Sequence, residues 1–153
     1  MKVTSNLDTK KFEQKTQRFI KRYFEISISE YSRLGRERVT DARNKSKEMG
    51  SFDDKTGNLR SSIGFILFYD SVEVGKEFPG KLVFGKQAGI SSAHEAVLDY
   101  PKGWAIVIVA GMSYASHVEA KNFDVITGST LGMSAKFANA QKRIKTLLQK
   151  EFS

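Results

Sequence analysis

Apolar residues recur at helical spacing over roughly the first 40 residues of the chain. At about 100° per residue they fall on one side of a helix, and most of the Lys and Arg residues flank them. The pattern predicts a long N-terminal helix with Ser5 or Asp8 as its N-cap. The stripe consists of Phe12, Thr16, Phe19, Ile20, Tyr23, Ser27, Tyr31 and Leu34.

The second part of this helix is polar. Gly35 lowers helix stability by up to about 1 kcal/mol relative to Ala, which marks it as a place for a kink or a break. Within residues 36–48 the only apolar anchors are Val39 and Ala42. A helix of this polarity is expected to project into solvent or to lie against a neighbouring chain, and Gly50 is its expected end.

A two-residue period follows the turn-rich segment 51–57. Residues 61–69 alternate between two apolar faces, and Val72 and Val74 repeat the alternation, which predicts a hairpin. One face carries Ile63, Phe65, Leu67 and Tyr69, and the other carries Ile66 and Phe68. Residues 104–110 are apolar at every position, so we expect them to form the central strand, covered on both sides.

The remaining segments complete an α+β fold. Residues 76–103 show no clear period and contain several Gly residues, which predicts a Gly-jointed loop or β-arm that contacts other protein. Residues 123–126 are expected to form a short fourth strand or an extended arm. Helical spacing returns near the C-terminus, with Ser129 or Thr130 as the cap. We therefore predict one domain in which a long N-terminal helix and a C-terminal helix pack on a small antiparallel β-sheet. Its parts are the N-terminal helix in residues 1–50, the sheet with its arm in residues 51–128, and the C-terminal helix in residues 129–153.

Charge is distributed unevenly along the chain. The net charge of +8 divides into +6 for residues 1–48, −2 for residues 49–132 and +4 for residues 133–153. Basic ends of this kind fit stacking on copies of the chain, contact with an acidic partner, proximity to nucleic acid, or simply Lys-rich helix faces in water. The longest apolar run is far shorter than the ~20 residues of a membrane span, and the N-terminus lacks the apolar region of a secretory signal, so no membrane contact is expected.

Residues for catalysis or metal binding do not form a recognisable set. Cysteine is absent, and the two histidines, His94 and His117, are separated in sequence and have no third ligand at metal-site spacing. Residues 80–87 resemble a phosphate-binding loop, but Gln87 stands where the magnesium-binding Ser or Thr is required. We therefore expect no enzymatic activity, no cofactor and no metal.

Two short motifs resemble those of the lambda-like phage tail-completion, or head–tail joining, family. The first is Thr56-Gly57-Asn58-Leu59-Arg60-Ser61-Ser62-Ile63, followed by a strand. The second is the strand that leads through Gly111 into Tyr114-Ala115-Ser116-His117-Val118-Glu119. The matching positions are Gly57, Leu59, Ser62, Ile63, Tyr114, Ala115, Val118 and Glu119. The order of elements is also similar over about residues 8 to 150, although Ala120-Lys121-Asn122 replaces the Phe-Gly that often follows the family's Glu.

The resemblance implies a virion structural protein of the phage neck or tail. Such a subunit assembles in the host cytoplasm into a homo-oligomeric ring that joins the head, at its portal or adaptor, to the tail. Glu119 is then expected either to form a salt bridge with a neighbouring subunit or to lie in a solvated turn.

Six basic residues are the candidate inter-subunit contacts. They lie in the polar helical segment and in the predicted arm, two segments with too few apolar residues to be held by their own domain. They are Arg36, Arg38, Arg43, Lys76, Lys81 and Lys86. The alternative function is that of a basic protein that contacts DNA without sequence specificity, since no helix-turn-helix pattern is present.

Overall fold

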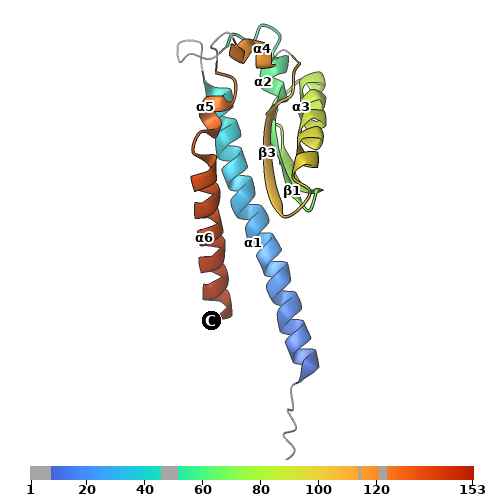
Figure 1. Ribbon diagram of the computed structural model, residues 1–153, viewed down its shortest axis with the longest axis vertical. Coiled ribbons are helices and arrows are strands. Elements are labelled where there is room, and N and C mark those ends of the chain that lie inside the picture. Colours follow the sequence, from blue (N-terminus) through green and yellow to red (C-terminus); the bar gives the residue numbers. More distant parts are fainter. Residues whose placement is uncertain (1–7, 46–51, 114, 121–123) are drawn as a thin grey trace, which may run out of the picture.

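A computed structural model of the chain describes residues 8–45, 52–113, 115–120 and 124–153. These residues form a mixed helix-and-sheet structure with a long N-terminal helix, a C-terminal helix and a three-stranded antiparallel sheet, which confirms the predicted fold class (Figure 1). The N-terminal helix lies against one face of the sheet with the C-terminal helix packed alongside it, and a shorter helix covers the other face.

The N-terminal helix, α1 (Thr9–Asn44), is continuous. Asp8 caps it as predicted, since its Oδ1 accepts a hydrogen bond from the backbone N–H of Lys11 at 3.2 Å. Ser5 and Gly50 lie outside the described residues. The helix shows no break at Gly35. The glycine has a packing role instead, because a Cβ at this position would lie 2.7 Å from the Phe65 ring, which packs against the helix here.

Burial along α1 runs opposite to the expectation from its polarity. Val39 and Ala42 are only 1% and 0% exposed, so the described part of the polar segment 36–48 is held by its own domain. Residues Thr9–Ile20 are exposed at every position, and the start of the helix extends beyond the end of the C-terminal helix (Figure 1). Val39 and Ala42, three positions apart, are enough to anchor the polar segment. The long charged side chains around them can extend to the edge of the contact between α1 and the rest of the domain, so their charges stay in water.

The sheet has the strand order β2-β1-β3. Its strands are β1 (Ile63–Tyr69), β2 (Val72–Glu77) and β3 (Trp104–Ala110). The hairpin and both apolar faces of β1 are confirmed: Ile63, Phe65 and Leu67 join the core under α1, and Ile66 and Phe68 join the core on the other side. The prediction that residues 104–110 form the central strand is wrong. The segment β3 is an edge strand, and its apolar residues on both faces pack against the two helical layers.

The predicted arm 76–103 is instead largely helical. It contains α3 (Val83–Ala96) and the 3₁₀ turn η2 (Val97–Asp99), which cover the second face of the sheet. The buried positions Gly85, Gly89, Ala93 and Val97 recur every four residues, so the helical period exists but is made mostly of small residues. A hydropathy pattern based on large apolar side chains does not register such a helix.

The C-terminal helix is α6 (Met133–Phe152), and its residues Ala140, Ile144 and Leu148 are buried against α1. Gly132, at a φ of 72°, precedes it, so the predicted caps Ser129 and Thr130 belong instead to the short helix α5 (Thr127–Thr130). Two further short helices are α2 (Asn58–Ser62) and α4 (Ala115–Ala120). The expected fourth strand is not formed by residues 124–126, which contain a single β-bridge residue, Asp124, and Phe123 lies outside the described residues.

Candidate functional site

The first sequence motif forms the turn that starts the sheet. Gly57 has a φ of 75° and precedes α2, and Asp54 caps this turn by accepting hydrogen bonds from the backbone N–H groups of Gly57 (2.9 Å) and Arg60 (2.7 Å). Leu59 and Ile63 are then buried, as the sequence predicts. The Ser62 hydroxyl is also buried and donates to the Leu59 carbonyl at 2.8 Å. These residues fix how the chain enters β1.

The second motif meets the first at the same end of the sheet. The Gly111 N–H donates to the Ser62 carbonyl at 3.4 Å, and Ala115, at the start of α4, is 9% exposed. A Cβ on Gly111 would lie 2.4 Å from backbone atoms of Gly89 in α3, so a glycine is needed for this close approach. Tyr114 and the side chain of Val118 lie outside the described part of the chain.

Glu119, the charged residue of the second motif, binds its own backbone. Its Oε1 accepts hydrogen bonds from the N–H groups of Val125 (3.3 Å), Ile126 (3.0 Å) and Thr127 (3.2 Å), and from the Thr127 hydroxyl (3.0 Å). Burial alone would raise the pKa of this carboxyl, but the hydrogen bonds outweigh it and lower the pKa below its ordinary value. Glu119 therefore organises the start of α5, which is neither of the two roles expected for it.

The three candidate arginines contact their own chain. Arg36 is exposed and pairs with Glu77 of β2 at 2.9 Å. Arg38, with its side chain 14% exposed, pairs with Asp41 at 3.0 Å. Arg43 donates to the carbonyl of Arg60, and burial, together with the nearby Arg60 charge, lowers its pKa. Only Arg36 is well placed to meet another molecule.

The three candidate lysines lie apart from the arginines and from one another in the sequence. Lys76, on β2, pairs with Glu73 at 2.8 Å. Lys81 is exposed just before α3, and Lys86 is half-buried within that helix. The six residues thus lie on different elements, and their charges do not form one basic surface.

A different feature stands out, the outer edge of β3. The hydrogen bond between Gly111 and Ser62, opposite one another in register, shows which residues of β3 bond to β1. Because bonded pairs alternate in an antiparallel ladder, Trp104, Ile106, Ile108 and Ala110 turn their N–H and C=O groups away from β1. No strand among the described residues pairs with them. The edge has seven uncharged residues and no proline.

Native edge strands are usually protected by charges, bulges or proline, which prevent unwanted pairing. The opposite edge, β2, follows this rule: it carries Glu73, Lys76 and Glu77, and its pairing with β1 is irregular at Leu67 and Phe68. The edge of β3 has none of these protections. The two edges of the sheet are therefore chemically different, and only the β3 edge lacks features that hinder pairing with another strand.

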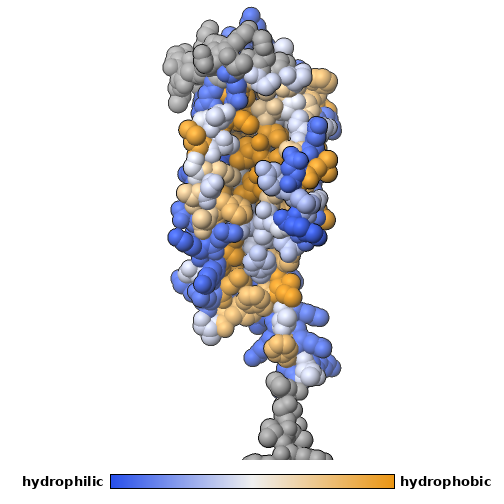
Figure 2. All heavy atoms as spheres, in the orientation of Figure 1, coloured by the Kyte–Doolittle hydropathy of each residue, from blue (hydrophilic) through white to orange (hydrophobic). Residues whose placement is uncertain are grey.

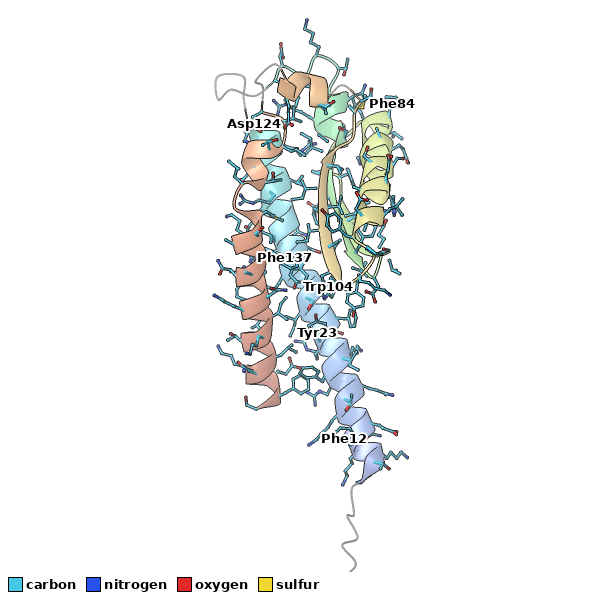
Figure 3. The ribbon with its side chains drawn as sticks, in the orientation of Figure 1. Phe12, Tyr23, Phe84, Trp104, Asp124 and Phe137 are labelled. Atoms are coloured by element: carbon cyan, nitrogen blue, oxygen red, sulfur yellow. The ribbon has the colours of Figure 1, made fainter. Side chains whose placement is uncertain are left out.

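A groove of about 580 Å³ lies along β3 and is closed on its other side by the start of α6. Trp104, Ile106 and Ile108 line one wall, and Met133 and Phe137 line the other. Figure 2 shows hydrophobic residues gathered on this face between α6 and the sheet. In Figure 3, Trp104 and Phe137 approach one another across α1.

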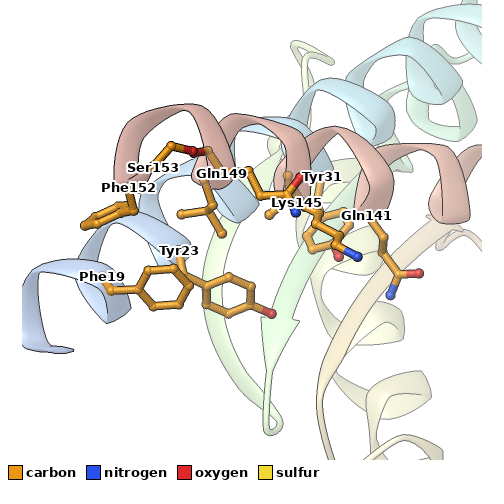
Figure 4. A pocket seen from close by; sticks show the side chains of 10 residues that line it. Phe19, Tyr23, Tyr31, Gln141, Lys145, Gln149, Phe152 and Ser153 are labelled. Carbon is orange, nitrogen blue, oxygen red and sulfur yellow. The ribbon is translucent and has the colours of Figure 1, made fainter.

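A second groove of similar volume continues between α1 and α6 (Figure 4). The Tyr31 ring connects the two grooves, since it stacks on Phe137 with centroids 4.7 Å apart and lies 5.2 Å from Trp104. Burial, and secondarily the neighbouring Tyr23, raises the pKa of Tyr31 to about 12, so its hydroxyl stays neutral. The Tyr23 hydroxyl accepts a hydrogen bond from the Trp104 indole at 2.9 Å. Both grooves are apolar and open, and they offer packing rather than acid–base chemistry.

The described residues contain no group of three or more His, Cys, Asp or Glu side chains placed to hold a metal ion. His94 lies on the surface, where its Nε2 is 3.0 Å from the Glu73 carboxylate. Within the same described ranges, no helix is long and apolar enough to cross a lipid bilayer.

Sequence reasoning missed the open edge because strand order is a tertiary property. An all-apolar segment fits a central strand and an uncovered edge equally well. Comparison with known proteins adds no assignment: no family model, curated protein or solved structure matches the chain.

Proposed function

We propose that this chain is a non-enzymatic structural subunit of a phage neck, where copies form a ring that joins the head, at its portal or adaptor, to the tail. The observation that carries the proposal is the unprotected edge of β3 with its adjoining apolar groove. An exposed, uncharged edge of this kind is a liability in a protein that stays monomeric. In an assembly it becomes an interface.

The difference between the two sheet edges supports a ring rather than a dimer. A ring closes when one surface of each subunit meets a different surface of the next, whereas a two-fold dimer uses the same surface twice. The β3 side offers free backbone groups and an apolar groove, and the β2 side is polar and charged. We place the next copy of the chain against the β3 side, in a head-to-tail contact.

The two motifs support the proposal in a different way. They resemble those of the tail-completion family, and in this structure they meet at one end of the sheet, where Gly111 bonds to Ser62. They set the path of the chain into β1 and out of β3. The motifs therefore belong to the scaffold that presents the edge, and the contacts between subunits lie elsewhere.

The substitution Ile106→Lys tests the interface. Ile106 turns its backbone groups outward and its side chain lines the groove, so a Lys there introduces the charge that protected edges carry. We expect the unmodified chain to form rings that electron microscopy and native mass spectrometry detect. The variant should stay folded by circular dichroism and form no rings. The control is Val83→Lys, which changes an exposed residue, 71% accessible, at the start of α3.

Hydrogen exchange provides a readout that does not depend on a variant. On assembly, the outward amides of Ile106 and Ile108 are expected to become protected. In the phage that encodes the chain, loss of the gene should give filled heads and tails that do not unite, and Val83→Lys should restore joining while Ile106→Lys should not. Normal infectious particles without the protein would refute the function, and rings with unprotected β3 amides would refute the interface.

A further inference from the structure

The whole charge excess of the protein resides in two helical segments. Residues 9–25 of α1 and residues 133–152 of α6 together contain eleven Lys and Arg residues against three Asp and Glu, which accounts for the net +8. The rest of the chain has fourteen of each sign and is neutral. We call these two segments the helical stalk. In Figure 2, hydrophilic side chains lie along the outer sides of both helices, with hydrophobic ones between them.

The cations of α1 share one side of the helix. At about 100° per residue, the six basic residues of residues 9–25 fall within an arc of about 140°. Phe19 and Tyr23 lie outside this arc and line the groove between α1 and α6. In α6, the basic residues lie outside the buried stripe of Ala140, Ile144 and Leu148, and one of them, Lys145, lines the groove between α1 and α6.

Internal ion pairs neutralise only part of the stalk. Arg22 pairs with Glu25 and Glu151, and Arg143 pairs with Glu30. Arg18 lies over the Phe152 ring, 5.7 Å from its centroid, and five further lysines are exposed and have no carboxylate within 4.0 Å among the described residues. They are Lys10, Lys15, Lys142, Lys145 and Lys150. Like charges at this density repel one another, and a partner that carries many negative charges relieves that repulsion.

The surroundings of these cations favour duplex DNA among polyanions. A single strand is normally bound through aromatic side chains that stack on its bases, but Phe19 packs edge-on against Phe152, with ring centroids 5.2 Å apart, and Tyr23 packs against Trp104. Binding of an amphipathic helix to a membrane requires its apolar side to insert. In α1 this side is divided, because Phe12 and Ile20 are exposed but Phe19 packs against Phe152 of α6. Rows of extended, mobile Lys side chains suit regularly spaced phosphates.

We infer that the helical stalk binds the phosphate backbone of double-stranded DNA without reading its sequence. The contacts are made by the exposed cations of α1 and α6, and not by Arg36, Arg38 and Arg43 or by the lysines of residues 76–86. The inference does not depend on ring formation, since the stalk is complete in one subunit. Its failure and the failure of the proposed assembly are therefore distinguishable.

The test compares two triple variants with equal net charge. In the first, Lys15, Lys142 and Lys145 of the stalk are changed to Gln. In the second, Lys55, Lys81 and Lys102, which are also exposed but lie outside the stalk, are changed to Gln. Binding of the full-length proteins to a fluorescent duplex of about 30 base pairs is measured by anisotropy, with NaCl varied from about 50 to 200 mM.

For the unmodified protein, we expect the affinity to fall steeply with salt and to be the same for unrelated duplex sequences. Each phosphate contact contributes about 0.9 to the slope of log K against log salt, so the stalk variant should lower the slope by about 2 to 3 and weaken binding at least about tenfold. The second variant should retain the slope and stay within about twofold of the original affinity.

Several outcomes would overturn the inference. Equal weakening by both triple variants would mean that net charge, and not the stalk, determines binding. Tighter binding to single-stranded DNA, or to vesicles containing phosphatidylserine, with the same dependence on the stalk lysines would assign the surface to that partner instead. Absence of duplex binding at the lowest salt concentration would also refute it.

Discussion

Several glycines in this chain act through their small size. Gly89 in α3 and Gly111 after β3 allow backbone segments to approach so closely that a Cβ on either would lie within about 2.5 Å of its neighbours. Gly35 does the same for α1 and the Phe65 ring. The three residues lie on different elements, and each sets how closely one layer packs on the next.

The substitution Gly89→Ala should therefore destabilise the fold. The new Cβ would meet the Ser62 carbonyl and the Phe78 ring at 2.5 Å, and such overpacking costs about 1 to 3 kcal/mol, part of which the better helix propensity of Ala offsets. We expect a net loss of about 1 to 2 kcal/mol in urea unfolding. At Gly75 the nearest atom is 3.5 Å away, so Gly75→Ala should be close to neutral; equal losses at the two positions would contradict this explanation.

Glu119 makes the stability of the fold dependent on pH. Its folded-state pKa is lowered, so its contribution is fully present above the unfolded pKa of about 4.3 and is lost as the pH falls through the folded value. Glu119→Gln should cost about 1 to 2 kcal/mol at pH 7 and progressively less below about pH 4. The free energy of unfolding, measured at pH 7 and below about pH 4, checks this, and Glu95→Gln, at an exposed position, is the control. A cost that is the same at both pH values would show that the carboxylate charge is not responsible.

At the level of elements, the sequence predicted local features better than the arrangement of the elements in space. The Asp8 cap, the alternation in residues 61–69 and the helical spacing near the C-terminus depend on neighbouring residues, and each was recovered. The helix α3 was missed because its packing side consists largely of Gly and Ala. The edge position of β3 was missed because pairing partners far apart in the sequence determine strand order. The proposed assembly surface, which depends on that edge, was therefore not predictable from periodicity alone.

The helix α1 combines a protruding half and a buried half in one continuous element. Residues 9–20 are exposed all round, whereas residues 26–42 include the buried Ile26, Tyr31 and Val39. Short helical segments without tertiary packing are only marginally stable in water. We expect hydrogen-exchange mass spectrometry to show fast exchange in residues 9–20 and slow exchange in residues 26–42 of the free protein. Uniform protection along α1 would mean that the protruding half is stabilised by contacts beyond those described.

On the scale of the whole molecule, two surfaces of different chemistry are separated in space. The part of the chain outside the stalk is electrically neutral as a whole, and its sheet ends at β3 in an apolar edge with outward backbone groups. The stalk carries the positive charge and extends away from the sheet along α1 (Figure 1). Association through the first surface depends on dehydration and backbone pairing, and association through the second depends on ionic strength. One small chain can thus meet two unlike partners without competition between them.

The unprotected edge of β3 also has a consequence for the cell that makes the protein. A strand that accepts another strand without charge or bulge to select it also accepts wrong ones, and surplus copies are then at risk of forming irregular fibrils. Such a chain is poorly suited to being stockpiled. If the proposed assembly holds, we expect its synthesis to be matched in time and amount to that of the proteins it joins, or its edge to be shielded in the meantime by a chaperone.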